Sequence, residues 1–209
     1  MGYHENGDSG INQTVCRNKR VSAEQLLKED IVDNWYIIHT KENQEDTIID
    51  RIQSKISNTR YNAIWIANRY EIRKKEGKEY VQKTKLYPGY VFINTEYIDE
   101  IEEFLSYNPE CKGLLKTGRA YSHIEGANRI LVGLLAKEAG QIGLSKGIII
   151  DGQTKVESGP LVGMEEYICK IDRHKRKAWL DFGDGKRVIF PLEITKKISS
   201  DSTGCASTE

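Results

Sequence analysis

The spacing of apolar and polar residues predicts a mixed succession of strands and helices over residues 35–140. Runs rich in aromatic and β-branched residues are typical of strands, and they occur at 35–40, 63–67, 90–94 and 111–117. Isoleucines and leucines that recur every three or four residues predict helices over 43–57, around 98–105 and over 130–139. This order indicates an α+β domain, in which helices pack on an antiparallel sheet.

Two further stretches have a different pattern. Residues 69–85 are charged throughout, with Tyr70, Ile72, Tyr80 and Val81 interspersed, which predicts a protruding β-hairpin that turns near Gly77. From Thr154 onward, short apolar runs alternate with turn residues, which predicts a small all-β barrel. We therefore expect five segments: a disordered extension (1–33), an α+β domain (34–140), a linker (141–153), a barrel (154–198) and a disordered tail (199–209).

Composition limits the function. The 209 residues include 31 Lys plus Arg and 31 Asp plus Glu, so the formal net charge of zero excludes a uniformly basic nucleic-acid coat. No run of apolar residues is long enough to span a membrane, and the N-terminus lacks a secretory pattern. The cysteines, Cys16, Cys111, Cys169 and Cys205, are far apart in sequence, as expected of free thiols. We expect a cytoplasmic monomer with no membrane contact.

Catalytic motifs are missing from the sequence. The histidines, His4, His39, His123 and His174, lack the spacing of a metal site, and no phosphate-binding loop or nucleophile motif occurs. We therefore expect neither an enzyme nor a bound cofactor or metal.

Two segments resemble the NusG family of transcription elongation factors. The first runs from Trp35-Tyr-Ile-Ile-His-Thr40 through Glu45 to Tyr87-Pro-Gly-Tyr-Val-Phe-Ile93, and it is similar to the N-terminal (NGN) domain of that family. The second, Val156-Glu-Ser-Gly-Pro-Leu-Val-Gly163 with Ile168-Cys-Lys-Ile-Asp172, is similar to its C-terminal KOW domain, an SH3-like barrel. Residues 159–165 and 170–178 look most like the LoaP group. Asn43 stands where the family often has glycine, and it tolerates the left-handed backbone that such a turn needs.

The resemblance implies a polymerase-binding patch on one strand. Tyr90 and Phe92 are two residues apart, so their side chains point to the same face, and Val91 and Ile93 point to the other. If Val91 and Ile93 pack on the helices, Tyr90 and Phe92 form an exposed aromatic patch. In the family this patch, together with Pro88, binds the clamp helices of RNA polymerase. The alternative is that both aromatics belong to the core, as we expect for Trp35 and Trp65.

Two groups of basic and polar residues are candidate nucleic-acid contacts. Around the first helix these are Lys41, Gln44, Arg51 and Lys55, which the resemblance places at the non-template DNA strand. In the barrel, Arg173, His174, Lys175, Arg176 and Lys177 form a dense run in a tight turn, and Lys186 and Arg187 extend it from a neighbouring turn. An anionic partner relieves the repulsion among these cations, and a nascent RNA hairpin is the partner that the LoaP resemblance implies. In both cases the alternative is a solvated surface.

Taken together, these features favour the interpretation that the protein is a transcription elongation factor that promotes processive antitermination. In this interpretation it bridges the RNA polymerase clamp and contacts structured RNA through its KOW domain. A general NusG-type elongation or pausing factor, whose KOW domain binds a ribosomal or termination protein, remains open. A ribosome-associated structural protein is a third possibility, against which the aromatic patch argues.

Overall fold

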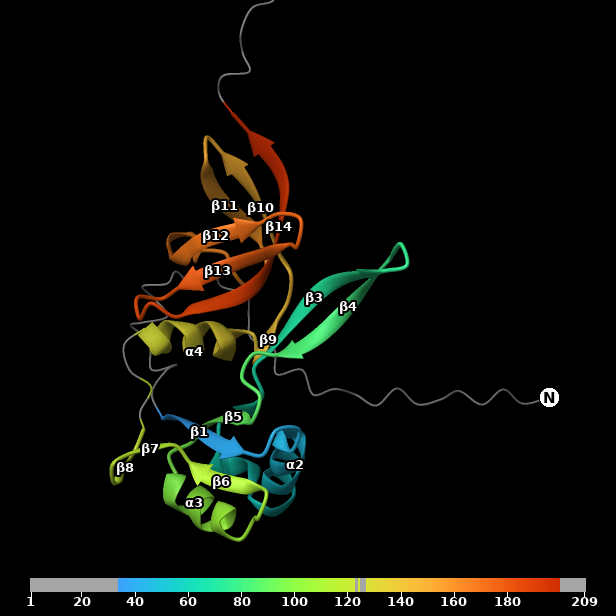
Figure 1. Ribbon diagram of the computed structural model, residues 1–209. Helices are drawn as coiled ribbons and strands as arrows, with labels where there is room; N and C mark the ends of the chain where they lie inside the picture. The colour runs from blue at the N-terminus through green and yellow to red at the C-terminus, as the bar shows by residue number, and fades with distance from the viewer. Residues whose placement is uncertain (1–33, 123, 125–126, 200–209) are drawn as a thin grey trace, which may run out of the picture.

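The computed structural model describes residues 34–122, 124 and 127–199, which Figure 1 draws as ribbon. The expected extension 1–33 lies outside the described residues, as does the expected tail beyond Ser199. Within the described residues, helices and several sheets alternate as predicted, and the α+β fold is confirmed.

Four antiparallel strands form the central sheet, in the order β2-β5-β1-β6. Their bounds are Trp35–Thr40 (β1), Ala63–Trp65 (β2), Tyr90–Asn94 (β5) and Cys111–Leu114 (β6). Because side chains alternate along a strand, each of the inner strands β1 and β5 contributes apolar residues to both faces of the sheet.

One face of the sheet is covered by α2 (Glu45–Lys55) and α3 (Ile98–Ser106). Ile48 and Ile52 lie one helical turn apart on α2, and both are fully buried. Val91 and Ile93 of β5 belong to the same core. The expectation that these two residues pack on the helices is therefore confirmed.

The opposite face of the sheet is covered by α4 (Ala127–Lys137), which Figure 1 shows between the sheet and the C-terminal strands. This helix begins three residues earlier and ends two residues earlier than the predicted helix over 130–139. All its residues from Ile130 to Leu135 are buried, because the sheet and the C-terminal strands pack on different sides of it. Trp35 and Trp65 lie in this core with ring centroids 4.9 Å apart, as expected.

Residues 145–198, called here the C-terminal β-unit, form a five-stranded sheet in the order β11-β10-β14-β13-β12. The strands are Ser145–Ile150 (β10), Gln153–Ser158 (β11), Ile168–Asp172 (β12), Lys177–Asp181 (β13) and Arg187–Ile198 (β14). The expected linker 141–153 is wrong, because β10 pairs with both β11 and β14. The isoleucines Ile148, Ile149 and Ile150 were the signal for this strand. The division into two domains stays a proposal, since α4 packs on both parts.

The predicted hairpin is present as β3 (Asn68–Lys75) and β4 (Lys78–Lys85), which pair in register along their whole length. Glu76 and Gly77 form its turn, with φ of 51° and 79°, as a two-residue hairpin loop requires. Beyond α4, β9 (Gln141–Ile142) pairs with the base of β3. The hairpin projects beside the C-terminal β-unit (Figure 1). Short elements complete the fold: η2 (Asn58–Arg60), β7 (Lys116–Thr117), β8 (Ala120–Tyr121) and η3 (Glu165–Tyr167).

Candidate functional site

A buried carboxylate fixes the turn that begins β5. Glu45, the first residue of α2, has no exposed surface, and its two oxygens accept hydrogen bonds from Gly89 N–H at 2.7 Å and Lys85 Nζ at 2.8 Å. Burial alone raises the pKa of Glu45, but these two bonds and the Lys85 charge outweigh it, so this pKa lies below its ordinary value. Asn43, two residues before α2, has a φ of 66°, which is the left-handed conformation expected of it. Glu45 thereby ties the α2 start to the turn and holds β5 in place.

Gly89 is required by this geometry. Its φ is +82°, and a Cβ there would lie 3.1 Å from Thr40 O. Thr40 N–H donates to Gly89 O at 2.8 Å, which joins the end of β1 to the same turn. Thr40, Glu45 and Gly89 therefore have a structural role, because their hydrogen bonds hold the end of β1, the start of α2 and the turn before β5 together.

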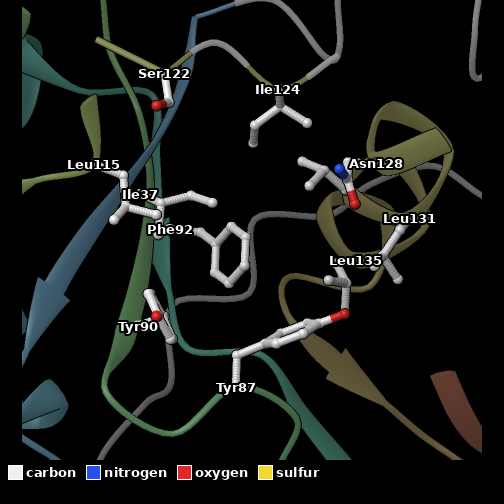
Figure 2. Close-up of a pocket in the computed structure, with 11 residues that line it drawn as sticks. Ile37, Tyr87, Tyr90, Phe92, Leu115, Ser122, Ile124, Asn128, Leu131 and Leu135 are labelled. Carbon is white, nitrogen blue, oxygen red and sulfur yellow. The ribbon is translucent and has the colours of Figure 1, made fainter. Parts of the chain in front are cut away.

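Next to this turn, an apolar groove of about 400 Å³ opens between the sheet and α4. Figure 2 shows Phe92 and Tyr90 on the sheet side, Leu131 and Leu135 on the α4 side, and Tyr87 reaching across below them. The full lining is Ile37, Tyr87, Tyr90, Phe92, Leu115, Ser122, Ile124, Asn128, Leu131, Val132 and Leu135. An apolar groove lined by aliphatic and aromatic side chains is suited to an apolar side chain of a partner.

The expectation of a freely exposed aromatic patch is wrong for Phe92. Its ring is 4% exposed and stacks on Trp65 with centroids 4.6 Å apart. Phe92 lies in the core beneath α4. The alternation along β5 alone does not show that this helix covers the face to which Phe92 points. Tyr90 is half-buried and stacks on His39 at 4.9 Å, and Pro88 is exposed. Tyr90 and Phe92 therefore line the groove instead of forming a flat exposed patch, and Pro88 lies outside the lining.

The candidates on and before α2 differ in exposure and in ion pairing. Arg51 Nη1 contacts Glu110 Oε2 at 2.7 Å and Asn108 Oδ1 at 3.0 Å, so this guanidinium is occupied within the fold. Lys55 is exposed at the last residue of α2, Gln44 is half-buried just before its first residue, and Lys41 is exposed four residues before the helix begins. A separate role for each in DNA contact stays a prediction.

The basic turn between β12 and β13 is divided between exposed and paired cations. Arg173, His174 and Lys175 are exposed. Arg176 pairs with Glu79 of β4 and with Glu193 of β14, each at 3.0 Å, and Lys177 Nζ lies 3.1 Å from Glu71 Oε1 of β3. The last two cations of the run therefore link the turn to the hairpin.

Lys186 and Arg187 do not extend this turn. They lie at the other end of β13, about 13 Å along the strand from Lys177. Lys186 lines a smaller hollow of about 140 Å³ beside Tyr87 and Phe182. The expected continuous patch is wrong, because a five-residue strand separates the two turns.

Sequence reasoning missed two features that position these surfaces. Glu71, 3% exposed, contacts Arg69 Nε at 2.9 Å and Arg73 Nη2 at 2.6 Å as well as Lys177, and Arg69 Nη1 donates to Ile189 O at 3.0 Å. The alternation of Arg69, Glu71 and Arg73 placed their side chains on one face of the hairpin and was the available signal. Tyr87 is the second feature: burial, with the Asp184 carboxylate, raises its pKa to about 12.

Residues 34–122, 124 and 127–199 contain no group of three or more potential metal ligands. No helix in this part of the chain is long and apolar enough to cross a membrane.

Comparison with known proteins finds similarity in the N-terminal part of the chain. Residues 33–130 match the NusG family model, which is described as transcription termination factor NusG; that family consists of non-enzymatic transcription factors. No curated protein matches the chain. Thermotoga maritima NusG is 19% identical, with 77% of this chain and 93% of that chain covered and a TM-score of 0.45. The Methanocaldococcus jannaschii NusG N-terminal domain is also 19% identical, covering 41% and 89%, with a TM-score of 0.22. A chain of the MjSpt4:Spt5 complex is 15% identical, covering 75% and 92%, with a TM-score of 0.22.

Proposed function

We propose that this protein, whose residues 33–130 carry a NusG-family domain, is a transcription elongation factor that binds the RNA polymerase clamp through its apolar groove. The observation that carries the proposal is the groove itself. It lies in the family-matched segment, and its lining includes Tyr90 and Phe92, two of the residues that the resemblance assigns to polymerase contact. Bridging the clamp favours the elongating state of the polymerase by differential binding, which requires no chemistry of the factor's own.

The basic turn supports the second part of the proposal, contact with a nascent RNA hairpin. Arg173, His174 and Lys175 are exposed together on the C-terminal β-unit, and the permanent cations Arg173 and Lys175 can contact phosphates. Two modest contacts on one chain give tighter recruitment than either contact alone. An RNA signal would then select the transcripts on which the factor promotes processive antitermination, as in the LoaP group. If the C-terminal β-unit binds a protein instead, the general NusG-type role follows.

Contact with the non-template DNA strand is the least supported part. Of the four candidate residues, Lys41 and Lys55 are exposed, whereas Arg51 would have to leave Glu110 to reach a phosphate. We expect Lys41, beside the turn of β5, to contribute more than Arg51.

The polymerase contact is tested by binding of the full chain to core RNA polymerase. Tyr90→Ala removes a half-buried ring at the groove edge, and we expect it to weaken binding by roughly tenfold or more, about 1.4 kcal/mol. Tyr107→Ala is the matched control, because Tyr107 is 80% exposed and does not line the groove. Equal affinities for the two variants, with both folded, would refute the groove as the polymerase contact.

A further inference from the structure

A second hollow, called here the basic cleft, lies between the hairpin and the basic turn and has a volume of about 540 Å³. The hairpin contributes Ile72, Arg73, Lys74 and Glu79, and the turn contributes Arg173, His174, Lys175, Arg176 and Lys177. Its lining contains six permanent cations and one carboxylate. Figure 1 shows the hairpin standing beside the C-terminal β-unit, so the two walls come from segments about 100 residues apart in the chain.

Ion pairs join the two walls of the basic cleft, but they neutralise only some of the cations that line it. Arg176 bridges Glu79 and Glu193, and Arg73 and Lys177 both contact Glu71. Within the described part of the chain, no carboxylate forms an ion pair with the three remaining cations, Lys74, Arg173 and Lys175. The nearest acidic group on the turn is Asp172, whose oxygen accepts a hydrogen bond from Lys175 N–H at 2.9 Å.

We propose that the basic cleft binds the phosphate backbone of RNA, with the hairpin as the second wall of the site. The proposal rests on the proposed function, in which the basic turn meets RNA, and it assigns a role to the hairpin. Cations that converge from two walls without carboxylate partners repel one another, and phosphates placed between them relieve that repulsion. Exposed lysine and arginine side chains match phosphate oxygens on a flexible backbone.

The lining favours nucleic acid over a protein partner. Protein interfaces depend on buried aromatic or aliphatic anchors, and Ile72 is the one aliphatic residue in the lining of this cleft. Recognition here is therefore electrostatic and reads the backbone rather than the bases. A site shared by both walls also couples RNA binding to the position of the C-terminal β-unit against the hairpin, because RNA bound to both walls favours their present arrangement.

The test measures binding of the full chain to a fluorescein-labelled RNA stem-loop of mixed sequence by fluorescence anisotropy across a salt series. Lys74→Ala removes one exposed cation of the hairpin wall. Near 0.1 M salt we expect a loss of roughly five- to tenfold in affinity, and a salt slope reduced by about 0.7–0.9. Lys74→Glu should lose more. Lys83→Glu is the matched control, because it makes the same charge change on an exposed residue of the same hairpin that does not line the cleft.

The outcomes separate this inference from the proposed function. If Arg173→Ala with Lys175→Ala weakens RNA binding but the Lys74 variants behave like Lys83→Glu, the hairpin is not a wall of the site, and the RNA-binding turn survives. If the unaltered chain binds no RNA, both the cleft and the RNA part of the proposed function fail, whereas the polymerase-binding assay still decides the groove. If duplex DNA of the same sequence binds as tightly and with the same sensitivity to Lys74, the assignment to RNA is overturned.

Discussion

Removing the buried charge of Glu45 tests whether this carboxylate organises the candidate polymerase groove. Glu45→Gln keeps the size of the side chain but deprives Lys85 Nζ, 2.8 Å away, of its anionic partner. At an effective dielectric constant of about 20, the attraction across such a distance is about 6 kcal/mol. Lys85 is 25% exposed, so water recovers part of the loss. We expect Glu45→Gln to reduce the free energy of unfolding by about 3 kcal/mol, near the lower end for a broken buried pair.

The assay is urea unfolding, followed by fluorescence of the tryptophans, at several pH values. The loss corresponds to a fall in Tm of roughly 6–12 °C for a chain of this size. Because the pKa of Glu45 is lowered in the folded state, its contribution is complete above its ordinary value of 4.5 and is lost as pH falls through the lower, folded value. The difference between the unaltered chain and Glu45→Gln should therefore shrink below pH 4.5. Glu42→Gln, an exposed change three residues before Glu45, should stay within about 0.5 kcal/mol. A Glu45→Gln loss below about 1 kcal/mol, or one that does not change with pH, would refute this reasoning.

Three further predictions concern other positions. Gly89→Ala should destabilise the fold by about 1–3 kcal/mol in chemical unfolding, because a Cβ at φ +82° meets Thr40 O, whereas Gly77→Ala, at φ +79° with open space around it, should cost less. Tyr87→Phe should lessen the loss of stability between pH 10 and 12, since a raised pKa makes the unfolded state ionise first as pH rises; equal alkaline losses would contradict the burial of Tyr87. Glu71→Gln should cost about 2–4 kcal/mol by removing the buried anion that Arg69, Arg73 and Lys177 share, and should speed hydrogen exchange in β3 and β13; unchanged exchange would contradict its role as the link.

Local patterns in the sequence were sufficient to predict most elements. The alternation in 69–85, with Gly77 at the turn, predicted the hairpin, and the spacing of Ile48 and Ile52 predicted α2. These elements depend on interactions within a few residues. The strand β10 was missed because the isoleucines that form it follow a glycine-containing stretch, and their pairing with β14 is distant in sequence.

The candidate sites were less predictable because they depend on which segments meet. Tyr90 and Phe92 share a face as the strand period requires, but the burial of Phe92 depends on Trp65 and α4. The cations at 173–177 were recognised as a cluster, yet their division into exposed and paired groups depends on Glu71, Glu79 and Glu193 from other strands. Lys186 is close to the cluster in sequence but far from it in space, because β13 separates them.

Site-specific photocrosslinking tests the central claim most directly. A photoreactive amino acid at Asn128, an exposed residue on the α4 side of the apolar groove, is compared with the same amino acid at Tyr107, which is exposed away from the groove. With core RNA polymerase, the account predicts a crosslink from position 128 to the clamp of the polymerase and none from position 107. Crosslinking from position 107 alone, or from neither position while the protein remains bound to the polymerase, would contradict it.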